Sequence, residues 1–126
     1  MTSELSSGTS WDIGFEKGIQ RMDLGLKGRR AIVCASSKGL GRACAMALAQ
    51  EGVRVVMNGR NRDDLLRTAE EISRSTGSEV IPVVADVTSV DGRAALLEAE
   101  ARPDILVNNA GGPPAGNFRD WSRDDW

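Results

Sequence analysis

Residues 31–52 read AIVCASSKGLGRACAMALAQEG, and this stretch decides the fold. The run 31–35 is short, continuous and apolar, which is typical of a strand that is covered on both faces in a parallel sheet. A glycine-containing loop, 35–41, follows, and an apolar pattern of helical period begins at its end. We expect that helix to end at Gly52 in the left-handed conformation. Its predicted buried face is made of Leu40, Cys44, Ala47 and Leu48.

The same alternation continues along the chain and predicts three further strands, at 53–58, 79–86 and 104–109. Asn61 and Ser89 are the expected N-caps of the two intervening helices, and Gly77 and Pro103 mark their ends. Their predicted buried stripes are Leu65, Ala69 and Ile72 in the first, and Val90, Ala94, Leu97 and Ala101 in the second. Such a series predicts an α/β fold with a doubly wound parallel sheet of order 3-2-1-4.

Pro82 lies inside the third predicted strand. Proline cannot donate to a strand ladder and therefore belongs on a sheet edge. The order 3-2-1-4 places the third strand at an edge, so the proline agrees with the predicted topology.

The loop ASSKGLG, residues 35–41, joins the first strand to the first helix. Its backbone N–H groups and the positive end of the helix favour an anion. A G-x-G alone is weak, because tight strand-to-helix turns also use it. Its place in a strand–helix–strand unit of roughly 30 residues favours a dinucleotide phosphate.

Arg60 lies about 20 residues after the glycine loop, where an acidic residue selects NAD and an arginine accommodates the 2′-phosphate of NADP. Lys38 supplies a second positive charge on the same side. These residues favour NADP over NAD. The alternative for Arg60 is a solvated residue at the start of a helix.

Four segments, CASSKGLGRACAMALAQEG, NGRN, ADVT and DILVNNAGG, together resemble the short-chain dehydrogenase/reductase family. The resemblance spans residues 23–126 and is greatest to the classical NADP-dependent branch, which includes 3-oxoacyl-[acyl-carrier-protein] reductases. It implies a Rossmann-type sheet that stops here after its fourth strand. It also implies hydride transfer between NADP and a small carbonyl or alcohol substrate, for example a 3-oxoacyl thioester.

The resemblance also implies roles for individual residues. The loop residues contact the pyrophosphate and the 2′-phosphate, Asp86 and Val87 contact the adenine, and Asn109 and its successors contact the ribose and nicotinamide, while Asn108 pins the strands. Plainer readings are a strand-end turn for Asp86 and an asparagine-rich turn for Asn109. The implied cofactor-binding residues are Ser37, Lys38, Gly39, Leu40, Gly41, Arg60, Asn61, Asp86, Val87, Asn109, Ala110 and Gly111.

Two departures from the family pattern matter. Cys34 and Ala35 replace the usual Thr-Gly, so Ala35 must adopt the conformation of a tight-turn glycine. The family's catalytic Ser, Tyr and Lys fall beyond position 126, and the chain contains no tyrosine and no histidine. We therefore expect no catalytic residue here, and an amino-terminal, cofactor-binding part of a reductase that is inactive alone.

Two alternatives remain open: a non-catalytic NADP-binding module and an inert shortened product. The last residues, SRDDW, have the S-x-x-D pattern of a helix start. An unpaired fourth strand also predicts weak stability and aggregation. For a longer form the resemblance implies a homo-oligomer.

Composition bounds the remaining possibilities. The 126 residues are 40% hydrophobic with a net charge of −2, which predicts a globular domain. The sequence has no long basic run, so it does not predict nucleic-acid binding. No apolar run reaches the roughly 18 residues of a membrane span, and no signal segment is apparent, so we expect a cytoplasmic protein. Cys34 and Cys44 are expected to be buried thiols, with no metal site. Residues 1–24 are expected to be a disordered extension of the domain 25–126.

Overall fold

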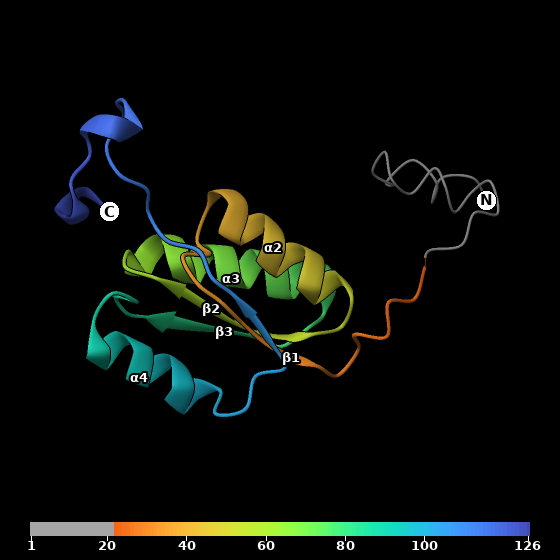
Figure 1. Ribbon diagram of the computed structural model, residues 1–126. Helices are drawn as coiled ribbons and strands as arrows, with labels where there is room; N and C mark the ends of the chain where they lie inside the picture. The colour runs from red at the N-terminus through yellow and green to blue at the C-terminus, as the bar shows by residue number, and fades with distance from the viewer. Residues whose placement is uncertain (1–21) are drawn as a thin grey trace, which may run out of the picture.

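The computed structural model describes residues 22–126 and contains one four-stranded parallel sheet (Figure 1). Its strands are β1 (Arg30–Val33), β2 (Arg54–Gly59), β3 (Val80–Val84) and β4 (Ile105–Val107), in the order β3-β2-β1-β4. The predicted order and the edge position of Pro82 are confirmed, and every predicted strand end lies within about two residues of the observed one. Most of the predicted extension, residues 1–21, lies outside the described residues.

Helices cover both faces of the sheet, as the doubly wound prediction requires (Figure 1). The helices α2 (Gly39–Gln50) and α3 (Arg62–Thr76) lie on one face, and α4 (Val90–Ala99) lies on the other. The larger core, between the sheet and α2 and α3, is centred on Val33, Val55, Met57, Leu65 and Ile72. The smaller core, under α4, contains Ile32, Cys34, Val56 and Leu96.

The predicted helix caps are confirmed. The Asn61 side chain accepts a hydrogen bond from the Asp64 N–H at 3.0 Å, and the Ser89 hydroxyl accepts one from the Gly92 N–H at 2.9 Å. Gly77 follows α3 with φ +74°, the left-handed conformation that lets a helix end without a Cβ clash. The predicted α3 stripe of Leu65, Ala69 and Ile72 is buried.

The predicted buried face of α2 is wrong. Leu40 is 80% exposed and Ala47 is exposed, whereas the buried positions are Gly41, Ala45 and Ala49. Cys44 and Leu48 are only partly buried against the core. The helix approaches the sheet so closely that its contact face is made of small residues, with larger apolar residues on its flanks.

The predicted buried face of α4 is also wrong. Val90 is 72% and Leu97 54% exposed, and Ala94 and Ala101 are exposed. The buried residues are Gly92 and Leu96. A Cβ on Gly92 would lie only 1.8 Å from the Asp86 carbonyl oxygen, so this glycine permits a close approach rather than merely weakening the helix.

At the amino ends of the strands, a carboxylate joins α4 to the sheet. Glu100, directly after α4, is 5% exposed and forms ion pairs with Arg54 and, at 3.6 Å, with Arg30. The Arg30 N–H also donates to the Asp104 carboxylate at 2.9 Å. Since these contacts lie at the opposite end of the strands from the glycine loop, their role is structural.

Beyond β4 the chain forms two short 3₁₀ turns, η3 (Phe118–Asp120) and η4 (Arg123–Asp125). At η4 the Asp125 carboxylate accepts from the Ser122 N–H at 2.6 Å and from the Ser122 hydroxyl at 2.7 Å, so the carboxylate half of the predicted S-x-x-D contact is present. Within residues 22–126, no helix combines the length and the apolar character that a membrane span requires.

Candidate functional site

A cleft of about 650 Å³ lies at the carboxyl ends of the strands, where open α/β sheets bind ligands. It brings together segments that are far apart in the sequence: the loop after β1, the ends of β2 and β3, and the loop after β4. The predicted binding residues that line it are Ser37, Lys38, Leu40, Arg60, Asn61, Asp86, Val87, Asn109, Ala110 and Gly111. The two remaining predicted residues, Gly39 and Gly41, do not line the cleft.

The amino end of α2 differs from the amino ends of α3 and α4. Those two helices have side-chain caps and acidic residues in their first turns, whereas α2 has neither. The residue at its N-cap position, Lys38, is a cation that lines the cleft. Free N–H groups, the positive end of the helix dipole and a lysine together favour an anion at this point.

Gly39 and Gly41 shape the loop, and their contact with a cofactor stays a prediction. Gly39 has φ +62°, which suits a residue without Cβ at the turn into the helix. Gly41 is buried, and a Cβ there would come within 2.1 Å of the Ala35 carbonyl oxygen. The G-x-G therefore brings α2 onto the end of β1.

Ala35 takes the tight-turn position that the family pattern assigns to glycine. Its φ is +47°, and among residues 22–126 it is the one non-glycine residue with positive φ. The expectation that a methyl group can occupy this turn is confirmed, although the left-handed region costs an L-residue about 1–2 kcal/mol.

Three polar side chains from other elements hold the loop. The Asn58 amide, 2% exposed, accepts from the Ala35 N–H at 3.3 Å and donates to the Ala85 carbonyl at 2.8 Å. Thr68 of α3 donates to the Ser37 carbonyl at 2.8 Å. Asn109 donates to the Ala35 carbonyl at 3.1 Å, so Asn58 and Asn109 both connect the ends of neighbouring strands. Asn108, which was expected to connect the strands, is exposed.

Asp86 follows β3 and is held by its neighbour. One carboxylate oxygen, Oδ1, accepts from both the N–H and the hydroxyl of Thr88, at 2.9 and 2.6 Å. These two bonds, the hydroxyl's first, lower the pKa of Asp86 from its ordinary value, and the positive charge of Arg60 adds to the effect. Asp86 is therefore an ionised acceptor at neutral pH.

The sequence reasoning missed several residues of the cleft. Asn58 had a visible signal, since it is a polar residue at the end of an apolar strand, and Thr88 follows the predicted Asp86 by two positions. Four of the others are glycine or alanine, Asp64 lies in the first turn of α3 and Trp126 follows η4, so their place in the cleft depends on tertiary structure. The cleft residues that were not predicted are Ala35, Asn58, Gly59, Asp64, Ala85, Thr88, Gly112 and Trp126.

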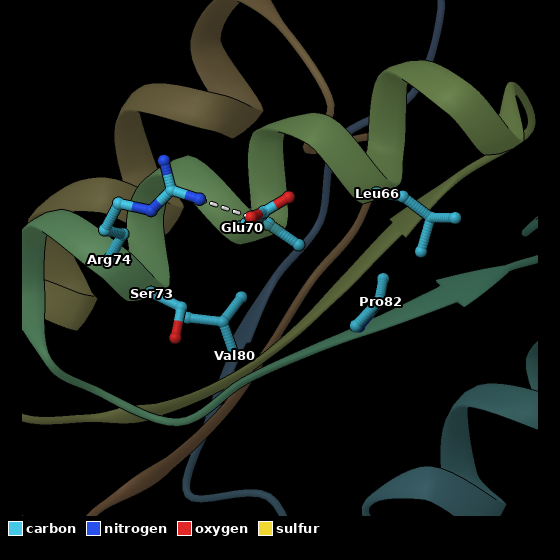
Figure 2. A pocket seen from close by; sticks show the side chains of 7 residues that line it. Leu66, Glu70, Ser73, Arg74, Val80 and Pro82 are labelled. Atoms are coloured by element: carbon cyan, nitrogen blue, oxygen red, sulfur yellow. Dashed lines mark hydrogen bonds and ion pairs between the residues drawn. The ribbon is translucent and has the colours of Figure 1, made fainter.

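A second, shallower groove lies between α3 and the edge strand β3 (Figure 2). Figure 2 shows Leu66 and the Glu70–Arg74 ion pair on α3, and Pro82 on β3 opposite Leu66. This groove contains none of the predicted binding residues and no glycine loop. We therefore assign no cofactor to it.

The two cysteines are free thiols. Cys34 at the end of β1 is 4% exposed, and burial raises the pKa of its thiol. Cys44 is partly buried on α2, so the expectation of burial holds fully only for Cys34.

Comparison with known proteins places this geometry among oxidoreductases. Residues 29–126 match the family model described as short chain dehydrogenase. The chain is 35% identical over 106 residues to the oxidoreductase YvaG of Bacillus subtilis, covering 83% of this chain and 40% of that protein. It is 38% identical over 105 residues to gluconate 5-dehydrogenase of Gluconobacter oxydans, covering 80% and 41%.

Among solved structures, the chain is similar to L-sorbose reductase from Gluconobacter frateurii, crystallised with NADPH and L-sorbose. The TM-score is 0.75 at 33% sequence identity, and the match covers 83% of this chain and 41% of the reductase. The chain thus spans about two fifths of the length of the relatives that it matches.

Proposed function

The chain belongs to the short-chain dehydrogenase family, and from this premise we propose that it binds NADP in the cleft at the carboxyl ends of its strands, as the cofactor-binding part of an oxidoreductase. The observation that carries the proposal is the uncapped amino end of α2, which opens into the cleft beside Lys38. Backbone N–H groups at such a position bind phosphate oxygens.

The residues of the cleft fit the parts of a phosphorylated dinucleotide. Ser37, Lys38 and Leu40 would hold the pyrophosphate. Gly111 and Gly112 have no atom within 4 Å of where a Cβ would stand, so the loop after β4 leaves open space for a ring. Asn109 and Ala110, beside that loop, would hold the ribose and nicotinamide. When bound, the cofactor supplies or accepts a hydride.

Two cations support NADP over NAD. Lys38 and Arg60 both line the cleft, and no acidic side chain stands at position 59 or 60 to repel a 2′-phosphate. Asp64 also lines the cleft, but its carboxylate is paired with Arg67 at 2.6 Å, which offsets part of its charge. Arg60 and Asn61 would therefore hold the 2′-phosphate.

For the reaction we propose hydride transfer between NADP and a small carbonyl or alcohol substrate, with 3-oxoacyl thioesters as a narrower candidate. This chain's own part is cofactor binding, because it offers no tyrosine or histidine for proton transfer. We expect no reductase activity from the 126 residues alone. Two free cysteines support a cytoplasmic location, and by family likeness we propose a homo-oligomer for a longer form.

Calorimetric titration of the purified chain with NADPH and NADH tests the proposal. NADPH should bind more tightly than NADH, and Arg60→Ala should weaken NADPH by about tenfold or more while leaving NADH unchanged. Arg62→Ala is the matched control, because Arg62 is an exposed arginine two residues away that does not line the cleft. Absence of binding by either cofactor at about millimolar concentration would refute the proposal.

A further inference from the structure

Thr68, in the second turn of α3, makes its side-chain hydrogen bond outside its own helix. The residue is 5% exposed, and its hydroxyl donates to the Ser37 carbonyl at 2.8 Å. Among residues 22–126, no other group donates to that carbonyl. The main chain of the loop after β1 is therefore held at this point by one hydroxyl of a neighbouring helix.

This bond fixes the direction of a whole peptide unit. The peptide between Ser37 and Lys38 is trans, and in a planar trans peptide the carbonyl and the N–H point in opposite directions. Because the Ser37 carbonyl faces α3, the Lys38 N–H points away from α3. Within the described part of the chain this N–H has no acceptor, and both residues line the cleft. Thr68 thus holds a free donor of the cleft in one orientation.

The same peptide unit lies beside the strand end that precedes Arg60. A Cβ on Gly59 would stand 3.2 Å from the Ser37 hydroxyl oxygen. Arg60 is followed directly by Asn61, the capping residue of α3. One helix therefore anchors Arg60 at its amino end and the loop through Thr68.

We propose that Thr68 is a positioning residue that sets the preference of the site for NADPH over NADH, by fixing Lys38 relative to Arg60. The inference rests on the proposed function, in which these two cations favour a 2′-phosphate. The attraction between charges falls with their separation, so a loop that can turn or shift brings less positive charge to that phosphate. NADH carries no 2′-phosphate, and the loss therefore falls mainly on NADPH.

The test is calorimetric titration of both cofactors into variants of residue 68. Thr68→Val removes the hydroxyl at nearly constant shape and should reduce the ratio of NADPH affinity to NADH affinity by about fivefold. Thr68→Ser keeps the hydroxyl and should keep the wild-type ratio. Thr76→Val is the matched control, because Thr76 donates to the Ile72 carbonyl within α3 itself and does not line the cleft. Thr68→Ala, which also lacks the hydroxyl, replaces the valine variant if circular dichroism shows that valine disturbs the fold.

The outcomes separate this inference from the proposed function. If the wild-type chain prefers NADPH but the valine and alanine variants keep the wild-type ratio, or weaken both cofactors equally, Thr68 is only structural and the inference is overturned. A folded serine variant that loses the preference as fully as the valine variant overturns it as well, because the hydroxyl would then not be the cause. If the wild-type chain binds neither cofactor, or binds both equally, the proposed function fails and the inference fails with it.

Discussion

Ala35 shows how a single backbone angle reflects the demands of the site. The turn from β1 to α2 needs a left-handed residue, and this chain places an alanine there with φ +47°. The methyl group costs about 1–2 kcal/mol in that region. Three contacts hold the strained turn in place: the Asn58 and Asn109 hydrogen bonds to Ala35 and the packing of Gly41 against its carbonyl.

Ala35→Gly should therefore stabilise the protein. Relief of the strained angle outweighs the extra entropy that glycine loses on folding, so the free energy of unfolding should rise by about 0.5–1 kcal/mol in urea denaturation. Ala43→Gly, at an exposed position of α2, is the control and should lower the free energy of unfolding by about 1 kcal/mol. A loss of stability in both variants would show that the turn is not strained.

At the residue level, sequence reasoning found the side chains with a charge or an unusual position, such as Lys38, Arg60 and Asp86. Their presence in one cleft follows from the predicted strand order. The supporting residues Asn58 and Thr68 were not predicted, because their partners depend on tertiary contacts. Thr88 was not predicted either, although its partner Asp86 is only two residues away.

At the level of elements, strands and caps were predictable and two helix faces were not. Strand runs and cap residues are local signals, and they held for every strand and for Asn61, Gly77 and Ser89. Searching for large apolar residues at helical spacing failed for α2, whose buried residues are Gly41, Ala45 and Ala49. It also failed for α4, whose buried residues are Gly92 and Leu96. Gly41 and Gly92 are the points at which α2 approaches the Ala35 carbonyl and α4 approaches the Asp86 carbonyl.

Gly92→Ala tests this view of helix packing. Helix propensity alone predicts a gain of about 1 kcal/mol from Gly to Ala. We expect instead a loss of about 1–3 kcal/mol in the free energy of unfolding, because the new Cβ would meet the Asp86 carbonyl at 1.8 Å.

The exposed neighbour Ala94 provides the control for propensity. Ala94→Gly should lower the free energy of unfolding by about 1 kcal/mol. A Gly92→Ala protein that is more stable than the wild type would contradict the close approach of α4.

At the scale of the whole molecule, the two edges of the described sheet differ in how well they resist pairing with another strand. On β3 the edge carries Pro82, which cannot donate to another strand. On β4 the edge is short and apolar, and Leu106 is 57% exposed. The β4 edge is therefore the predicted site of self-association.

Leu106→Glu should raise the protein concentration at which light scattering first increases, by several-fold, because it places a charge on the apolar edge. Gln50→Glu on α2 is the matched control, since it changes the net charge equally at an exposed position away from that edge. Equal gains in both variants would assign the effect to net charge and not to the edge.

The central claim is that one cleft, built by four separated segments, binds NADPH. The most direct test is a titration of the nitrogen-15-labelled chain with NADPH, followed by amide chemical shifts. Shift changes should concentrate at residues 35–41, 60–61, 86–88 and 109–112. Changes concentrated instead between Leu66 and Pro82, at the α3–β3 groove, or no changes at about millimolar cofactor, would contradict the account.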